Sequence, residues 1–196
     1  MDSKRTKQLK AFDRLLTIMD ELRTNCPWDK KQTFASLRHL TIEETYELSE
    51  ALLSGDLGEV KNELGDLLLH IIFYAKIGSE QKAFDIGDVA NAISEKLINR
   101  HPHIYGDVEV KDDADVKKNW EKLKLKENNK GVLSGVPKSL PSLVMAIRMQ
   151  DKAAGIGFDW KSIDGVKDKI KEELSELANE INHGTKEKIT DELGDV

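Results

Sequence analysis

The sequence predicts an all-α protein, a helical bundle built from antiparallel helix hairpins. Apolar residues recur at spacings of three and four almost throughout, whereas alternating, strand-like runs are rare. A pattern of acids placed symmetrically about a glycine also occurs twice, which predicts a tandem repeat. The 196 residues are 39% apolar and 34% charged, a composition typical of a soluble globular chain with one or two hydrophobic cores.

The helical periodicity divides the chain into a series of helices with short connections. We expect helices near 6–24, 34–54, 57–78, 86–100, 113–127, 140–154, 162–182 and 185–196. Asp56, Asp85 and Asp112 each stand just before one of these segments and are expected N-caps. Gly78 and Gly184 are expected to end helices.

A break in the helical pattern predicts the domain organisation. Residues 128–141 read NNKGVLSGVPKSLP and concentrate Gly, Pro, Asn and Ser with little helical periodicity. We therefore predict a first helical unit over 1–128, a linker over 129–141 and a second unit over 142–196.

Charge and cysteine content exclude several classes of function. The net charge is −6 and the pI is near 5.5, so no global basic field favours a nucleic acid polymer or an anionic membrane. Cys26 is the only cysteine, which rules out an intrachain disulfide and a thiolate metal site within one chain. The N-terminus lacks a signal-peptide h-region, and the most apolar stretch, LLLHIIFYA, is too short to span a bilayer. We expect a cytoplasmic protein without a membrane anchor.

Four acids are arranged symmetrically about Gly55. Glu44 and Glu47 share one helix face because residues three apart are neighbours, and Glu63 and Asp66 form a second such pair. In an antiparallel hairpin that turns at Gly55, the inner acids lie roughly 12 Å from the turn and the outer acids roughly 16 Å, at about 1.5 Å rise per residue. The two pairs are therefore expected to come level.

The surroundings of these acids predict a metal ion. The helix after Asp66 is apolar nearly all round, which predicts burial, and ionised acids that face a core repel one another unless cations compensate them. Oxygen ligands favour a hard ion, Mg²⁺ or alternatively Mn²⁺. A solvated acidic face is the competing interpretation. A di-iron site would need Glu-x-x-His on two helices, but the motif occurs once, from Glu180 to His183. His70 is interpreted as a core histidine or a partner of the acids.

The same spacing returns 129 positions later, about Gly184. The corresponding acids are Glu173, Glu176, Glu192 and Asp195, and the sequence ELGD is repeated intact. The second copy ends one residue after its last acid, so we expect an incomplete site that is poorly active alone, with a frayed Asp195.

Longer blocks of the sequence resemble the MazG-type nucleoside triphosphate pyrophosphohydrolases, which belong to the all-α NTP pyrophosphatases. These blocks are CPWDKKQTFASLR, EETYELSEA, ELGDLLLHIIFYA, RHPHIYGDVEV, NWEKLKLKE and GVPKSLPSLVMAIRMQDKAAGIGFDW, and they cover nearly the whole chain. The resemblance implies hydrolysis of an NTP to NMP and pyrophosphate, with Mg²⁺ held by the ExxE and ExxD acids. It also implies a homodimer that assembles a four-helix core.

Carried over to this sequence, the resemblance assigns further roles. The metal ligands and catalytic acids are Glu44, Glu47, Glu63 and Asp66, with Glu43 as either an additional ligand or a residue that contacts the ligands without binding the metal. The substrate-binding candidates are Lys96, Arg100 and Lys124 for the triphosphate and Trp120 and Trp28 for the base. Ordinary surface charge and core packing are the competing interpretations for these residues. Two other functions stay open: a helical dimerisation module with a structural or regulatory ion, and a pyrophosphatase with a narrower nucleotide substrate.

Overall fold

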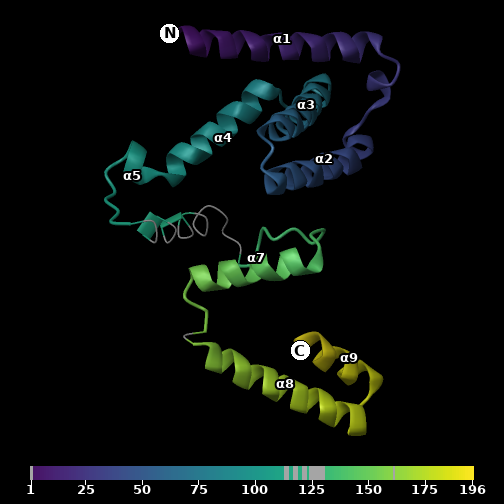
Figure 1. Cartoon of the computed structure of the whole chain (residues 1–196), viewed down its shortest axis with the longest axis vertical. Coiled ribbons are helices and arrows are strands. Elements are labelled where there is room, and N and C mark those ends of the chain that lie inside the picture. The colour runs from purple at the N-terminus through teal and green to yellow at the C-terminus, as the bar shows by residue number, and fades with distance from the viewer. Residues whose placement is uncertain (1, 113–114, 117–118, 121–122, 124–130, 161) are drawn as a thin grey trace. The chain divides into compact units, whose positions relative to one another are not determined.

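The computed structural model is helical and confirms the predicted fold class. It describes residues 2–112, 115–116, 119–120, 123, 131–160 and 162–196, and these contain no strand. The elements are α1 (Ser3–Asn25), the 3₁₀ turn η1 (Asp29–Lys31), α2 (Phe34–Ser54), α3 (Leu57–Glu80), α4 (Ile86–Arg100), α5 (Pro102–Tyr105), α7 (Ser142–Gly155), α8 (Ile163–His183) and α9 (Lys186–Asp195). Figure 1 shows their order along the chain.

The chain forms two compact units, Met1–Asn99 and Arg100–Val196. In the first unit α2 packs antiparallel on α3 and α1 packs on α3; in the second, α8 packs on α9. The division into 1–128, a linker 129–141 and 142–196 stays a prediction. The predicted helix 113–127 lies largely outside the described residues, although Asp112 accepts a hydrogen bond from the Asp115 N–H at 2.9 Å as predicted for an N-cap.

Local signals set the α2–α3 hairpin. α2 begins with a capping box between Thr33 and Ser36. It ends at Gly55, whose φ of +77° is in the left-handed region that glycine adopts without steric cost. Asp56 then caps α3 by accepting hydrogen bonds from the N–H groups of residues 58 and 59, at 2.7 and 3.3 Å. The hairpin turn therefore lies where the sequence predicted it.

Two further predictions, an N-cap at Asp85 and a helix end at Gly184, are confirmed. Asp85 caps α4 by accepting a hydrogen bond from the N–H of Asp88 at 3.0 Å, and the Asp88 carboxylate accepts one from the N–H of Asp85, also at 3.0 Å. Gly184 ends α8, as predicted, and its N–H donates to the Glu180 carbonyl.

The predicted end of α3 at Gly78 is wrong. The helix continues to Glu80, and the chain turns at Lys82, which has a φ of +55°. Gly78 is buried instead, and a Cβ added there would lie 2.7 Å from the Phe84 ring. The lack of a side chain at Gly78 allows the Phe84 ring to pack against the helix. The glycine is therefore explained by tertiary packing and not by the end of the helix.

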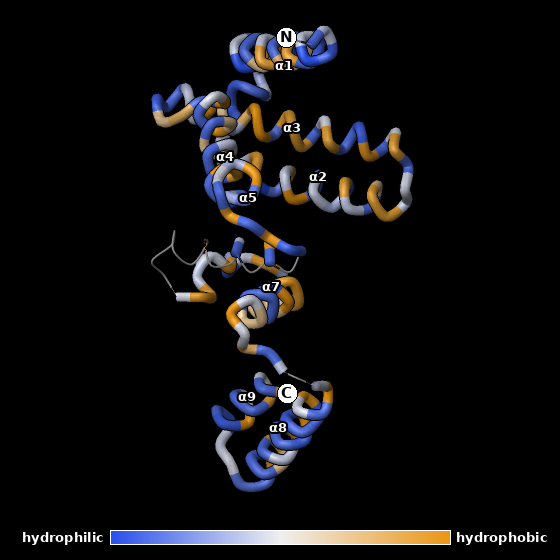
Figure 2. The backbone as a smooth tube through the Cα atoms, turned by 90° about the vertical axis from the view of Figure 1, so that its left-hand side faces the viewer, coloured by the Kyte–Doolittle hydropathy of each residue, from blue (hydrophilic) through white to orange (hydrophobic). Residues whose placement is uncertain are grey.

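The core of the first unit lies along α3. Its buried members are Met19, Leu37, Ile72, Phe73 and Ile77. Figure 2 shows that the part of α3 approaching α4 is strongly hydrophobic, whereas α8 and α9 are mostly hydrophilic. The half of α3 that follows the acids is thus anchored in a core, as its apolar sequence predicted.

An arginine near the end of α1 connects η1, a turn that the sequence did not predict, to the end of α3. The Arg23 guanidinium bonds both Glu80 carboxylate oxygens and donates to the carbonyls of Asp29 and Gln32. These contacts join α1, η1 and α3. The bond to Arg23 lowers the pKa of Glu80, and the bond to Glu80 raises the pKa of Arg23.

Candidate metal centre

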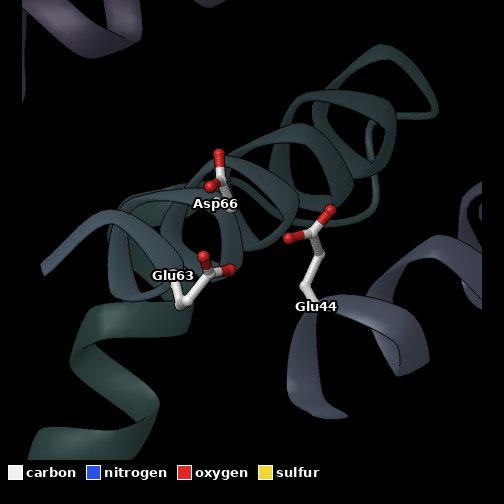
Figure 3. A group of neighbouring side chains, drawn as sticks. All are labelled: Glu44, Glu63 and Asp66. Carbon is white, nitrogen blue, oxygen red and sulfur yellow. The ribbon is translucent and has the colours of Figure 1, made fainter. Parts of the chain in front are cut away.

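Three of the predicted acids meet on the α2–α3 hairpin. Glu44 comes from α2, while Glu63 and Asp66 come from successive turns of α3, and one carboxylate oxygen of each lies within 4.8 Å of the others. Figure 3 shows the three carboxylates gathered around the space between the two helices. We call these residues the first acid cluster. Glu47 is exposed and lies outside this group of three, although its charge acts on both glutamates.

Burial differs among the acids. Glu44 and Glu63 are half-buried, whereas Asp66 is exposed. The Oε2 atom of Glu63 is buried and has no hydrogen-bond partner among the described residues. A buried carboxylate oxygen without a donor is costly, and a divalent cation is a chemically suitable partner for it. The donor set, carboxylate oxygens alone, suits a hard ion. The residues present therefore fit a metal ion.

The electrostatics of the first acid cluster lead to the same conclusion. Desolvation raises the pKa of Glu44, and the negative charges of Asp66, Glu47, Glu63 and Glu43 raise it further. The pKa of Glu63 is raised by desolvation and then by Glu47, Asp66 and Glu59. Each shift means that the folded chain without a cation disfavours ionisation of the group.

This arrangement predicts an unusual pH dependence of stability without metal. Because folding raises the pKa of Glu44 and Glu63 above the ordinary value of 4.5, the folded state binds more protons than the unfolded state. The contribution of these groups to stability should therefore fall as the pH rises from about 4.5 through their raised pKa values. Thermal unfolding in EDTA at a series of pH values, compared with the Glu44→Gln/Glu63→Gln variant, measures this contribution. A wild-type chain that gains as much stability with rising pH as the double variant would contradict the prediction.

A partly buried hydrogen-bond network lies one turn from the acids. The Thr41 hydroxyl on α2 lies 2.7 Å from Nδ1 of His70 and 2.6 Å from the Tyr74 hydroxyl, both on α3. Desolvation lowers the pKa of His70, and the charge of Asp66 opposes that shift. His70 is therefore a satisfied core histidine, in agreement with its interpretation from the sequence. The sequence pattern gave no sign of Thr41 or Tyr74 as its partners.

A second acid cluster forms on the α8–α9 hairpin from Glu173, Glu176 and Glu192, whose carboxylate oxygens also lie within 4.8 Å of one another. Desolvation raises the pKa of Glu192, followed by the charges of Glu176, Asp195, Glu173 and Glu180. α9 extends to Asp195, but Asp195 lies outside the group of three. This cluster contains an ion pair, since Lys169 Nζ lies 2.7 Å from a Glu173 oxygen, whereas none joins the acids of the first cluster to another described residue.

A family comparison matches both hairpins. The family model described as the MazG nucleotide pyrophosphohydrolase domain matches residues 32–105 and 161–196, and each segment contains one acid cluster. The chain belongs to the MazG family.

Relatives within the MazG family cover most of this chain. It is 40% identical to the nucleoside triphosphate pyrophosphohydrolase of Escherichia coli K12, over 96% of this chain and 75% of the relative. It is 44% identical to the nucleoside triphosphate pyrophosphohydrolase/pyrophosphatase MazG of Thermotoga maritima, over 85% of this chain and 66% of that protein. The crystal structure of a mazG-related protein from Thermotoga maritima aligns with a TM-score of 0.50 and 25% identity, covering 57% of this chain and 97% of that one.

The structure describes four of the five substrate-binding residues predicted from the MazG resemblance. The Arg100 guanidinium lies over the Trp120 ring, 5.5 Å from its centroid, and His101 meets the same ring edge-on at 4.9 Å. Lys96 is exposed on α4, and Trp28 is 54% exposed before η1. Lys124 lies outside the described residues. The pairing of Arg100 with Trp120 was not predicted, because the two are far apart in sequence.

None of the helices that the structure describes carries an apolar run long enough to cross a membrane.

Proposed function

We propose that this chain hydrolyses nucleoside triphosphates to nucleoside monophosphate and pyrophosphate. The observation that carries the proposal is the first acid cluster, within a segment that matches the MazG domain; one buried oxygen of Glu63 has no hydrogen-bond partner in the part of the chain that the structure describes. The names of the relatives describe the same chemistry. A cluster of carboxylates does not itself attract a triphosphate, so a cation has to mediate between them.

The proposed cofactor is Mg²⁺, with Mn²⁺ as the alternative, because both are hard ions that prefer oxygen ligands. Glu44, Glu63 and Asp66 would hold it, and Glu47 is the proposed fourth ligand from its spacing on α2. When bound, such an ion supplies charge neutralisation at phosphate oxygens and lowers the pKa of water. The half-buried Glu44 and Glu63 would hold the ion at a defined position, because the part of α3 that follows Glu63 is packed in the core.

The remaining substrate contacts are proposed from the chain's cations and aromatic rings. Lys96, Arg100 and Lys124 would bind the negative triphosphate, and Trp120 and Trp28 would stack on the base. The contact between Arg100 and Trp120 supports the proposal that both residues bind the same nucleotide. Packing on the ring restricts the guanidinium, and its N–H groups can still bind a phosphate. The second acid cluster is proposed to be a weaker site with a similar acid set.

A homodimer is proposed from the exposed apolar surface of the α2–α3 hairpin. The exposed fractions are 60% for Leu52, 87% for Leu53, 80% for Leu57 and 53% for Leu64. Surfaces of this kind on paired helices are commonly buried against a second copy to make a four-helix core. A cytoplasmic location and the absence of nucleic acid polymer and membrane partners follow from composition and stay predictions.

The test is a turnover profile of the purified chain. Each common ribo- and deoxyribonucleoside triphosphate is incubated with Mg²⁺, with Mn²⁺ or with EDTA, and the products are separated chromatographically. We expect monophosphate and pyrophosphate in equal amounts, only with a divalent ion; relative kcat/KM values then identify any preferred base or sugar. Diphosphate and inorganic phosphate as products would contradict the proposal. Metal binding without turnover would favour the helical dimerisation module.

A further inference from the structure

The backbone around η1, which precedes α2, is held by side-chain hydrogen bonds. The Arg23 guanidinium donates to the carbonyls of Asp29 and Gln32. The Gln32 side chain donates to the Trp28 carbonyl at 3.0 Å and accepts a hydrogen bond from the Ser36 hydroxyl at 2.8 Å. Side chains of α1, of α2 and of the turn itself therefore hold this backbone in one conformation.

Arg23 is in turn fixed by its own surroundings. Its side chain is only 10% exposed, and its guanidinium lies over the Phe73 ring, 5.5 Å from the centroid. The N–H groups that do not bind the turn bind the Glu80 carboxylate. A guanidinium offers five N–H donors in one plane, so a single side chain can bind a carboxylate and two carbonyls together. One residue thus links the turn to the end of α3.

The turn carries a tryptophan whose ring the first unit leaves largely uncovered. Trp28 is 54% exposed, although its carbonyl accepts hydrogen bonds from the Lys31 N–H and from the Gln32 side chain. A large flat ring on a fixed backbone loses little conformational freedom when a flat partner stacks on it. A fixed backbone and an open ring together favour a binding role for Trp28.

The turn also lies at a suitable place along the α2–α3 hairpin. α2 begins and α3 ends beside it, so η1 lies at the end of the hairpin opposite Gly55. From Phe34, the first residue of α2, to Glu44 is roughly 15 Å along the axis, at about 1.5 Å per residue. An extended nucleoside triphosphate spans a distance of this order. A nucleotide with its phosphates at the first acid cluster can therefore bring its base to the turn.

We propose that Arg23 is a positioning residue for base recognition, because it fixes η1 so that the Trp28 ring is presented as a stacking face to the base of the nucleotide. Arg23 itself contacts neither the substrate nor the metal. The inference rests on the proposed function and adds to it a residue that acts through another.

A double-mutant cycle of Arg23→Lys and Trp28→Ala tests the inference in the full chain. Lysine keeps the positive charge beside Glu80 but lacks the planar set of donors that reaches both carbonyls of the turn. For each variant, KM and kcat are measured with a nucleoside triphosphate and Mg²⁺. Inhibition constants are measured for the nucleoside monophosphate, which has a base, and for inorganic pyrophosphate, which has none.

Lys76→Met is the matched control. Lys76 Nζ lies 2.6 Å from an Asp20 oxygen, an ion pair that also joins α3 to α1 but lies outside the hydrogen bonds of the turn. Circular dichroism and melting temperatures check the fold of every variant. Gln32→Met, which removes the side-chain bond to the Trp28 carbonyl, replaces Arg23→Lys if that variant fails to fold.

We expect Trp28→Ala to raise KM about tenfold, the order of a lost stacking contact with a base, and to leave kcat nearly unchanged. Arg23→Lys should raise KM in the same direction, together with the inhibition constant of the monophosphate but not that of pyrophosphate. The double variant should be no worse than Trp28→Ala, because Arg23 acts only through the ring. Lys76→Met should leave KM unchanged.

Several results would overturn the inference while leaving the proposed function intact. These are additive effects of Arg23→Lys and Trp28→Ala, an equal rise in KM in Lys76→Met, or a parallel rise in the inhibition constant of pyrophosphate. A changed oligomeric state of Trp28→Ala in size-exclusion chromatography, with an unchanged KM, would assign the ring to contact with a second copy instead. Absence of turnover in the unaltered chain would overturn the proposed function and the inference with it.

Discussion

Glu63→Gln is expected to lower kcat/KM for nucleoside triphosphates by at least about a hundredfold. Removing a residue that only supports a metal ligand already costs about 10–100-fold, and Glu63 is a proposed ligand itself. The same change should raise the melting temperature of the metal-free chain. Glutamine keeps the size of the side chain but removes the negative charge that Glu47 and Asp66 repel. Opposite effects on turnover and on metal-free stability distinguish loss of a ligand from general damage to the fold. Steady-state kinetics and thermal unfolding in EDTA measure the two quantities.

Glu50→Gln is the matched control for this prediction. Glu50 is exposed on α2, the helix that supplies Glu44, and it lies outside the first acid cluster. Its replacement removes one negative charge from the same hairpin and should leave both turnover and melting temperature nearly unchanged. Full activity of Glu63→Gln, or equal losses in the two variants, would show that the first acid cluster does not hold the catalytic ion.

Saturating Mg²⁺ or Mn²⁺ is expected to stabilise the chain against thermal unfolding. An ion that binds only the folded state adds about 2.7 kcal/mol when its free concentration is about 100 times Kd. For a chain of this length the melting temperature should rise by several degrees, roughly 2–4 °C for each kcal/mol. Glu63→Gln should lose the part of this increase that comes from the first acid cluster. Calorimetric melting curves over a range of metal concentrations measure the effect.

General screening of negative charge must be separated from specific binding in this experiment. NaCl at matched ionic strength provides the control, because monovalent salt also weakens repulsion among exposed acids. An equal rise in melting temperature with NaCl, or an unchanged rise in Glu63→Gln, would contradict a site built by the first acid cluster.

Features that depend on local periodicity could be predicted from the order of the residues alone. A glycine between two helical patterns indicated the turn at Gly55, and Asp56 indicated the start of the helix that follows it. Once the turn is known, equal spacing brings Glu44 level with Asp66, because every residue of an α-helix advances by the same rise. The MazG resemblance could also be recognised without the structure, because its sequence blocks follow one another in order along the chain.

The surroundings of individual side chains became known from the packing of the folded chain. It placed Gly78 under the Phe84 ring and left Glu47 outside the first acid cluster. It also joined Thr41 to His70 and gave Glu173 a lysine partner while Glu63 has none among the described residues. Helical spacing specifies which face a residue occupies, but burial and choice of partner depend on side chains brought in by packing. The helix faces that carry the acids were thus predictable, and the balance of charge around the acids was not.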